Sequence, residues 1–234
     1  MSSVYGNLSI WGTDVKAMIL AAGKGERMMP LTKSTPKPLL KAGNKALIEY
    51  HIEALVHAGI TDIVINTAKF GEQIETALGD GAHWRARILY SHEGVSPKGT
   101  GGGVQLALPL LGKAPFFLIN GDVWTDYDFS KLNKPAEKLA HLIMVENPNH
   151  NQGGDFGLSG GQVVLDDGNK LTYSGIGIFN PEFFSSETQT MFSFVPSLQT
   201  AIKRGLVSGE KNKGLWFDIG TPQRLEKLDI LLKK

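Results

Sequence analysis

Short apolar runs alternate with helical patterns over the first half of the chain. The runs "KAMILAA" (16–22), "DIVINTA" (62–68), "ARILYS" (86–91) and "PFFLIN" (115–120) have strand length and are nearly continuous, which is typical of parallel strands covered on both faces. Between them, "ALIEYHIEALVHAG" repeats apolar residues at helical spacing and stops at Gly59, and "GEQIETALGDG" stops at Gly79. This alternation predicts a doubly wound α/β sheet.

The second half has a different pattern. The strand-like stretches "AHLIMVEN" (140–147), "GQVVLDD" (161–167) and "YSGIGIFN" (173–180) are joined by polar loops, with no long helix between the first two, so we expect an antiparallel extension there. A helix at 193–205, a strand at 214–220 and a closing helix at 221–234 complete the chain. The expected fold is a Rossmann-like, doubly wound mixed sheet with a small antiparallel extension. We expect one domain at 16–234 after a disordered or variable leader at 1–15.

The composition and net charge of the chain limit the kinds of ligand that we expect it to bind. The 234 residues carry a formal net charge of +1, which provides no overall field for a nucleic-acid backbone or an anionic membrane surface. The chain has no cysteine, which excludes disulfides and thiolate chemistry and suits a reducing compartment. The leader "MSSVYGNLSIWGTD" lacks the features of a signal peptide, and no apolar run approaches the roughly 20 residues of a membrane span. We therefore expect a cytoplasmic protein with small-molecule ligands, and the oligomeric state stays open.

A glycine-rich turn follows the first predicted strand, at the edge where ligands bind in open α/β sheets. Gly23 and Gly25 expose backbone N–H groups suited to phosphate oxygens, although a glycine pair after a strand also occurs as an ordinary turn. The turn is not a Walker A loop, and Met28 stands where a dinucleotide fingerprint has its third glycine. Side chains must then supply the positive charge. The candidates are Arg27, with its planar fork, and Lys37, which is held between two prolines.

The stretch "LAAGKGERMMPLTKSTPKPLL" resembles the signature of the sugar-1-phosphate nucleotidyltransferases, which combines a glycine-rich loop, an arginine, Pro-x-Thr and Pro-Lys-Pro. The resemblance extends to "LINGDVWTDYDF" and "WFDIGTPQRL", so it covers nearly all of the chain from residue 16 onward. It implies the nucleotidyltransferase fold and a reaction in which a sugar 1-phosphate oxygen attacks the α-phosphorus of a nucleoside triphosphate and pyrophosphate leaves. It also implies that the loop residues that bind substrate are Ala21, Ala22, Gly23, Lys24, Gly25 and Glu26.

The same resemblance assigns the charged residues to roles. Arg27 would hold the departing β,γ-phosphates, and Lys37 would hold the α-phosphate and the incoming sugar phosphate. So much negative charge calls for a divalent cation, which prefers carboxylate oxygens. Asp122 follows one predicted strand and Asp218 ends another. Acids after strands also serve as turn or cap residues, but these two lie where the family has its metal carboxylates, so we expect them to bind Mg²⁺, with Asp122 also catalytic.

Glycine-rich stretches supply the candidates for substrate recognition. In "EGVSPKGTGGGV", Glu93 could accept the N3–H of a uracil, and the main chain of three glycines could pack against a base or ribose, although a flexible surface loop has the same composition. These glycines are Gly101, Gly102 and Gly103. The segments "NQGGDFG" and "TYSGIGIF" stand where the family lines its acceptor pocket, with structural turns as an equal alternative. Their candidate residues are Gly154, Asp155, Tyr173 and Gly175.

The substrate pair rests on resemblance alone. The segments "NGDVWTDYDF" and "TGGG", and the missing Glu-Lys-Pro segment, resemble family members that use UTP and N-acetylmuramate 1-phosphate in peptidoglycan recycling. Alternative pairs within the class are mannose 1-phosphate with GTP, glucose 1-phosphate with dTTP, and phosphocholine with CTP. A sugar-nucleotide sensor without turnover is an alternative of another class. It is disfavoured because a sensor has no need of two metal carboxylates.

Overall fold

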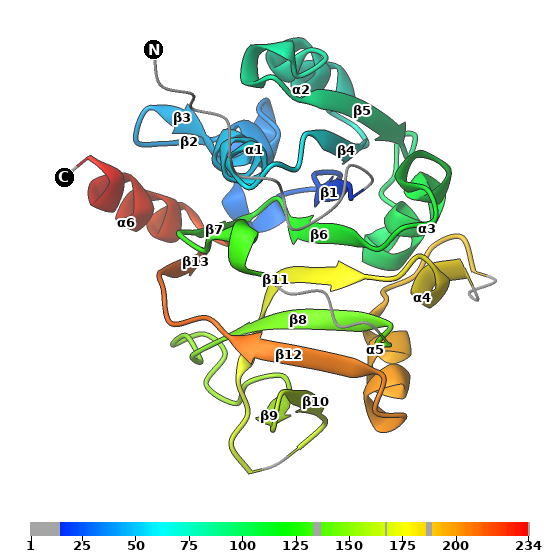
Figure 1. The fold of residues 1–234 in the computed structure, drawn as a ribbon. Coiled ribbons are helices and arrows are strands. Elements are labelled where there is room, and N and C mark those ends of the chain that lie inside the picture. The colour runs from blue at the N-terminus through cyan, green and yellow to red at the C-terminus, as the bar shows by residue number, and fades with distance from the viewer. Residues whose placement is uncertain (1–14, 133–136, 167, 186–188, 234) are drawn as a thin grey trace, which may run out of the picture.

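The computed structural model describes residues 15–132, 137–166, 168–185 and 189–233, so most of the predicted leader lies outside the described residues (Figure 1). A nine-stranded mixed sheet runs through the molecule in the order β5-β4-β1-β6-β11-β8-β12-β10-β9. Its strands are β1 Ala17–Leu20, β4 Asp62–Thr67, β5 Arg87–His92, β6 Phe116–Asn120, β8 Ala140–Val145, β9 Gly157–Ser159, β10 Gln162–Val164, β11 Thr172–Phe179 and β12 Val207–Lys211. Two-stranded sheets pair β2 Lys41–Ala42 with β3 Lys45–Ala46, and β7 Val123–Thr125 with β13 Trp216–Asp218.

The parallel half of the sheet confirms the predicted pattern of apolar runs. Strand β1 pairs in parallel with β4 and β6, and β4 pairs in parallel with β5. The helices α1 Leu47–His57 and α2 Gly71–Leu78 lie between these strands in the chain, as predicted. Helix α1 ends before Gly59, which has a φ of 83°, a conformation that glycine adopts at little energetic cost. The carboxyl ends of four parallel strands therefore meet at one edge of the sheet.

The second half contains the expected antiparallel strands and two strands of the main sheet, β9 and β12, that the pattern did not reveal. Strand β11 pairs antiparallel with both β6 and β8, and β9 and β10 form an antiparallel pair at the far edge. Strand β12 inserts between β8 and β10 and runs parallel to β8. Its sequence "VSGEK" lacks an apolar run, which explains why it was missed. The helices here are α4 Glu182–Ser185, α5 Val195–Lys203 and α6 Pro222–Leu232.

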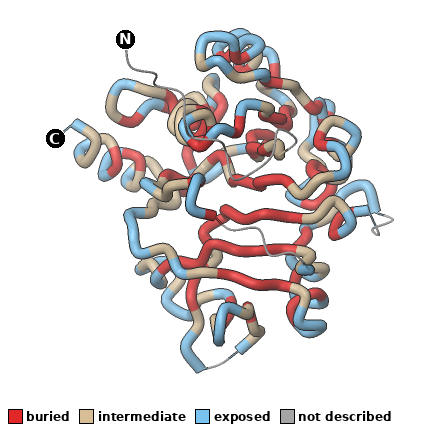
Figure 2. The backbone as a smooth tube through the Cα atoms, in the orientation of Figure 1, coloured by how far each residue is buried: buried red, intermediate tan, exposed pale blue. Residues whose placement is uncertain are grey.

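Two apolar cores cover the two faces of the sheet. Ala17 and Ile19 of β1 pack with α1 and α2, whereas Met18 between them packs with α5 and with α3, which spans Gly99–Leu111. This alternation follows from the two-residue period of a strand. Figure 2 shows the central strands as the buried layer of the molecule. A third, smaller cluster seats α6 through Leu225 and Leu228 beside β13.

The stretch expected to be an open glycine loop contains the start of a helix. Helix α3 spans Gly99–Leu111 and includes the three consecutive glycines. A Cβ on Gly101 would lie 2.2 Å from the ring of Phe192, and one on Gly103 would lie 2.3 Å from Glu93 Oε1. Glycine costs an α-helix about 1 kcal/mol relative to alanine. Here the close approach of neighbouring segments requires it, so these glycines are packing residues of a helix and not an exposed loop.

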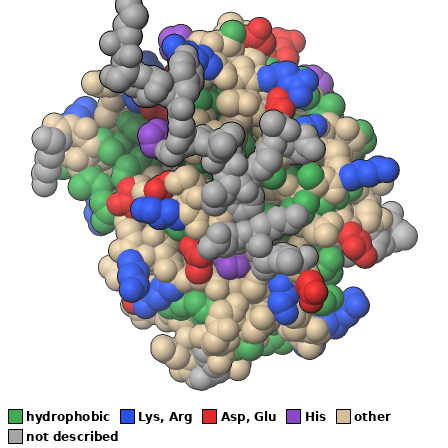
Figure 3. Space-filling model, in the orientation of Figure 1, with side chains coloured by type: hydrophobic (Ala, Val, Ile, Leu, Met, Phe, Trp, Pro, Cys, Tyr) green, Lys and Arg blue, Asp and Glu red, His purple; other side chains and the backbone are tan. Residues whose placement is uncertain are grey.

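On the face drawn in Figure 3, Lys and Arg side chains are interspersed with Asp and Glu. Among the described helices, none combines the length and apolar character needed to cross a bilayer.

Candidate active site

The ends of the parallel strands form a cavity of about 230 Å³. Residues after β1, β4, β5 and β6 meet there, as the rule for open α/β sheets predicts. The lining residues include Ala21, Ala22, Gly23, Lys37, Asn66, Glu93, Gly99, Thr100, Asn120 and Asp122. A larger adjoining cavity of about 500 Å³ lies beside the same glycine loop, and Lys24 and Glu26 line it. The structure thus brings the predicted phosphate loop, one predicted cation and one predicted metal carboxylate to a single site.

The glycine loop has the geometry that its sequence suggests. Gly25 has a φ of 67°, and a Cβ there would lie 2.9 Å from Thr32 Cγ2, so both conformation and space favour glycine. The Thr32 hydroxyl donates to the Gly25 carbonyl at 2.7 Å and fixes the turn. A Cβ on Gly23 would meet nothing within 4 Å, so this backbone faces open space in the cavity. Lys24 and Glu26 are exposed and 3.7 Å apart, a pairing that contributes little to stability.

Lys37 and Asp122 form an ion pair at the wall of the cavity. Lys37 opens a short 3-10 turn, Lys37–Leu39, and the residue before it is extended, as expected between two prolines. Its side chain is buried, and Nζ donates to Asp122 Oδ2 at 2.7 Å. The ammonium keeps further N–H groups for a ligand, since it carries three. A predicted phosphate-binding cation therefore touches a predicted metal ligand.

The two predicted metal carboxylates become neighbours through the small β7–β13 sheet. Asp218 pairs with Val123, the residue after Asp122, and the Ile219 N–H donates to the Asp122 carbonyl at 2.8 Å. Buried His51 of α1 contacts strand β7, because its Nε2 lies 2.8 Å from the Val123 carbonyl oxygen. Burial lowers the pKa of His51 to about 4, so Nε2–H of the neutral ring donates this bond at neutral pH. Two segments almost a hundred residues apart thus present their carboxylates at one place.

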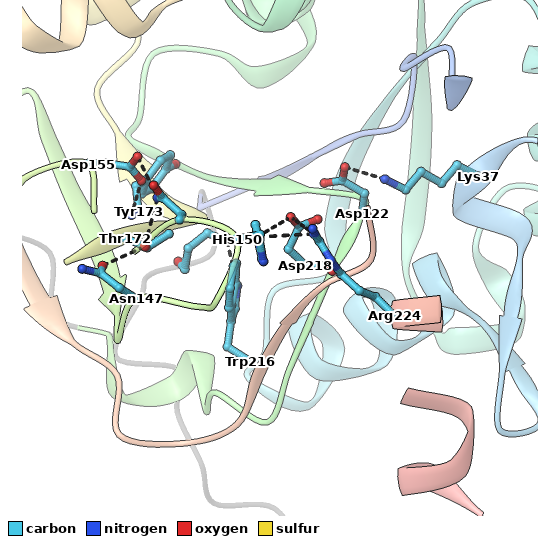
Figure 4. A network of polar contacts seen from close by, with 12 residues as sticks. Lys37, Asp122, Asn147, His150, Asp155, Thr172, Tyr173, Trp216, Asp218 and Arg224 are labelled. Atoms are coloured by element: carbon cyan, nitrogen blue, oxygen red, sulfur yellow. Dashed lines mark hydrogen bonds and ion pairs between the residues drawn. The ribbon is translucent and has the colours of Figure 1, made fainter. Parts of the chain in front are cut away.

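Asp218 is held by two side chains that the sequence analysis did not single out (Figure 4). Arg224 of α6 donates to Asp218 Oδ2 at 2.6 Å, and His150 Nε2 lies 3.0 Å from the same oxygen. Arg27 also lies near this cluster. A Cβ on Gly220 would lie 3.1 Å from Asp218 Oδ1 and 3.4 Å from Arg27 Nη1, so this glycine leaves room for the cluster.

The donor set fits a magnesium ion. Asp122 and Asp218 each bind cationic side chains through Oδ2, and Oδ1 of each has no hydrogen-bond partner among the described residues. Mg²⁺ typically takes one or two carboxylates and completes its shell with phosphate oxygens and water. In the described part of the chain, no cluster of three or more acidic or histidine side chains forms a closed metal site. Magnesium binding by this pair stays a prediction with suitable chemistry.

Glu93 lies in the wall of the cavity and is anchored by protein donors. It is 6% exposed, and its two oxygens accept bonds of 2.5 Å from Asn66 Nδ2 and from the Lys98 N–H. The Asn66 Oδ1 accepts the Ala21 N–H at 2.7 Å, which links Glu93 to the glycine loop. Uracil recognition by Glu93 stays a prediction, and its carboxylate also has a structural task. Gly99 and Thr100 line the cavity, whereas the three glycines after them pack behind it.

Two of the four acceptor candidates, Asp155 and Tyr173, lie on the side of Asp218 that is away from Lys37 and Asp122 (Figure 4). Asp155 accepts from the Tyr173 N–H at 2.8 Å, and Tyr173 packs partly against the second core. Gly154 has a φ of 63°, and a Cβ there would lie 2.8 Å from Lys170 Cβ. Gly175 has a φ of 79° and leaves room for Asn120. Each of these residues has a structural reason to be present, and their contact with an acceptor stays a prediction.

Comparison with known proteins supports the assignment of the fold and chemistry. A family model described as nucleotidyl transferase matches residues 16–233. The N-acetylmuramate alpha-1-phosphate uridylyltransferase of Neisseria meningitidis serogroup B is 48% identical over 226 residues, covering 93% of this chain and 98% of that protein. The enzyme of the same name from Caulobacter vibrioides is 34% identical over 229 residues, covering 88% and 92%.

The solved structure of a UDP-glucose pyrophosphorylase complexed with UDP-glucose superposes with a TM-score of 0.76, at 20% identity over 93% of this chain and 97% of that one. This likeness shows the shared fold. With the family match over nearly its whole length, the chain belongs to the nucleotidyl transferase family, as a sugar-1-phosphate nucleotidyltransferase.

Proposed function

We propose that this protein transfers uridylyl from UTP to N-acetylmuramate α-1-phosphate, forming UDP-N-acetylmuramate and releasing pyrophosphate. The observation that carries the reaction class is the cluster at the strand ends, where two carboxylates each bind a cationic side chain beside a bare glycine loop. The substrate pair is supported by the two relatives that carry this activity in their names, one of them 48% identical. Peptidoglycan recycling in the cytoplasm is part of the same proposal.

In this reaction an oxygen of the acceptor phosphate attacks the α-phosphorus of UTP. A new P–O bond forms, the bond between the α-phosphorus and the bridging oxygen breaks, and its electron pair leaves with pyrophosphate. The attacking oxygen is already anionic, so no protein base is needed. The task of the site is to align the two phosphates and to offset the charge that they bring together.

In this proposal Lys37 binds both the α-phosphate and the acceptor phosphate. One of its N–H groups points at Asp122 Oδ2, and that bond fixes the ammonium at the cavity wall. The remaining N–H groups are available for an α-phosphate oxygen and for the acceptor phosphate. Removing one such preorganised donor typically slows a reaction by about 10²–10³-fold.

In this proposal Arg27 binds the leaving group. Its side chain is exposed on the turn Glu26–Met28, which directly follows Gly25 of the glycine loop, and it lies near Asp218. The planar guanidinium can bind two phosphate oxygens at once, which suits the β,γ-phosphates. Bound Mg²⁺, held by Asp122 and Asp218, would neutralise part of the phosphate charge and polarise the reacting phosphoryl group.

A product assay tests the proposal. Protein, Mg²⁺, UTP and N-acetylmuramate α-1-phosphate are mixed, and pyrophosphate and UDP-sugar are measured together. We expect the two products in a 1:1 ratio, and we expect strong loss of both with Lys37→Met. Release of phosphate without UDP-sugar would indicate hydrolysis. Absence of turnover with intact binding of UDP-sugar would indicate a sensor.

A further inference from the structure

The loop between β8 and β9 is unusually well fixed for a surface segment. We call residues 147–155 the acceptor loop, because the acceptor candidates Gly154 and Asp155 lie in it. Within the loop, the Asn151 N–H donates to the Pro148 carbonyl at 2.9 Å, and the Gly154 N–H donates to the Asn151 carbonyl at 3.1 Å. These bonds define two successive turns, so the loop has a specific shape before any ligand binds.

Side chains anchor this shape to strand β11. The buried Thr172 hydroxyl donates to Asn147 Oδ1 at 2.9 Å and accepts from Asn151 Nδ2 at 3.1 Å. Asp155 accepts from Asn151 Nδ2 at 3.1 Å and from the Tyr173 N–H at 2.8 Å. The loop is therefore attached to the central sheet at both of its ends.

His150 extends from this anchored loop to the metal carboxylate. Its Nε2 lies 3.0 Å from Asp218 Oδ2, the oxygen that also binds Arg224 at 2.6 Å. Nε2 lies 3.3 Å from Arg224 Nη1, but the shorter contact is to a carboxylate, which can only accept, so Nε2–H donates to Asp218. Figure 4 shows His150 and Asp218 between the acceptor-loop side and the Asp122–Lys37 side.

We propose that His150 is a positioning residue that links the acceptor loop to Asp218, so that the acceptor pocket and the metal carboxylate are held as one unit. His150 and Arg224 restrain Oδ2, so Oδ1, which has no hydrogen-bond partner among the described residues, would be the oxygen left for a cation. The inference rests on the proposed function for the identity of the acceptor. It goes beyond that function because it names a residue that couples the two halves of the site without touching the reacting atoms.

A surface histidine without this role would be solvated, and its substitution would leave ligand binding unchanged. The contact here is different, because the His150 side chain is 34% exposed and its donor meets an acidic side chain that is only 20% exposed. A hydrogen bond to a charged group contributes more than a neutral one, and its loss corresponds to roughly tenfold in a binding constant. Because the link joins the loop and not the glycine turn, its loss should affect acceptor binding and spare UTP.

The test uses full-length His150→Ala, with His57→Ala as the matched control, since His57 is an exposed histidine on α1. Calorimetry measures binding of N-acetylmuramate 1-phosphate in the presence of Mg²⁺ and α,β-methylene UTP, and separately binding of that analogue. For His150→Ala we expect about tenfold weaker acceptor binding, with analogue binding within about twofold of wild type. Steady-state kinetics should show the same difference between the two substrates, with a raised KM for the acceptor and little change in KM for UTP.

Hydrogen exchange without substrates provides an independent readout. The Gly154 and Tyr173 amides should exchange several-fold faster in His150→Ala than in His57→Ala. Thr172→Val should have a similar effect from the other end of the loop, and the double variant His150→Ala/Thr172→Val should lose little more acceptor affinity than the larger single loss.

Two results would overturn the inference. The first is unchanged loop exchange and acceptor affinity in His150→Ala. The second is an equal loss of acceptor and UTP-analogue binding, which would make His150 a general part of the metal site. If wild type binds no N-acetylmuramate 1-phosphate, the proposed substrate is wrong, and the exchange measurement alone then decides whether the link exists.

Discussion

Replacement of Asn66 by alanine tests the hydrogen-bond chain behind the glycine loop. Asn66 is 3% exposed at the end of β4, and both ends of its amide are used. Oδ1 accepts the Ala21 N–H at 2.7 Å, and Nδ2 donates to Glu93 Oε1 at 2.5 Å. Asn66→Ala therefore leaves a buried N–H and a buried carboxylate oxygen without these partners.

The size of the effect follows from those two groups. A buried polar group that loses its partner costs about 1–3 kcal/mol, and more when it is charged. For Asn66→Ala we expect the free energy of unfolding to fall by about 3–5 kcal/mol, so the melting temperature of a chain this long drops by roughly 6–20 °C. The loop loses its anchor at Ala21, so KM for UTP should rise more than KM for the acceptor.

Urea denaturation and steady-state kinetics measure these two consequences. Asn212→Ala is the control, because the Asn212 side chain accepts the nearby Gly214 N–H in an exposed turn, and the substitution keeps the backbone bond from the Asn212 N–H to the Met144 carbonyl. We expect the control to lose less than about 1 kcal/mol. If Asn66→Ala unfolds within 1 kcal/mol of wild type, or raises both KM values equally, the reasoning about this chain of bonds is refuted.

Three further predictions concern the charges of the site. Asp122→Asn and Asp218→Asn should each reduce kcat by about 10²–10³-fold with the fold intact by circular dichroism, and chelator-insensitive turnover would remove the metal assignment. Arg27→Ala should lower kcat/KM for UTP alone, whereas Lys37→Ala should lower kcat/KM for UTP and for the acceptor. Equal small effects of the two variants on kcat/KM would show that both residues are solvated surface cations and not phosphate ligands. Burial lowers the pKa of His51 to about 4 in the folded state, below its usual value of about 6.5. Between about pH 6.5 and pH 4 the unfolded state therefore binds more protons than the folded state. The free energy of unfolding should fall by up to about 3 kcal/mol as the pH is lowered across that window. His51→Gln keeps a donor toward the Val123 carbonyl and should flatten this pH dependence in urea titrations; an unchanged slope would contradict it.

Much of the fold followed from the sequence because local and tertiary preferences agree there. The apolar runs of β1, β4, β5 and β6 and the periodic faces of α1 and α2 each specify their own structure. Strand β13 lies within the strand predicted at 214–220, but strands β7 and β12 did not follow, because they are short or polar and pair with partners far along the chain. Helix α3 was not predicted because its three glycines disfavour a helix locally, and the close packing of Phe192 and Glu93 that requires them is visible only in the folded chain.

The sequence likewise predicted part of the candidate site. A glycine turn after a strand marked Gly23, two flanking prolines marked Lys37, and the family resemblance marked Asp122 after a predicted strand, because these features are local in the sequence. His150 and Arg224 gave no such signal. Each stands in an ordinary polar context, and only the folding of the acceptor loop and α6 brings them to one carboxylate oxygen.

The most direct test of the central claim is a comparison of kcat/KM across substrate pairs. Pyrophosphate release would be measured for UTP, GTP, dTTP and CTP, each with the 1-phosphates of N-acetylmuramate, N-acetylglucosamine, glucose and mannose, and for CTP also with phosphocholine. We predict the highest kcat/KM for UTP with N-acetylmuramate 1-phosphate, ahead of N-acetylglucosamine 1-phosphate, which lacks only the lactyl group. A higher kcat/KM for glucose or mannose 1-phosphate with any nucleotide would contradict the proposed substrate, and no turnover with any pair would contradict the reaction itself.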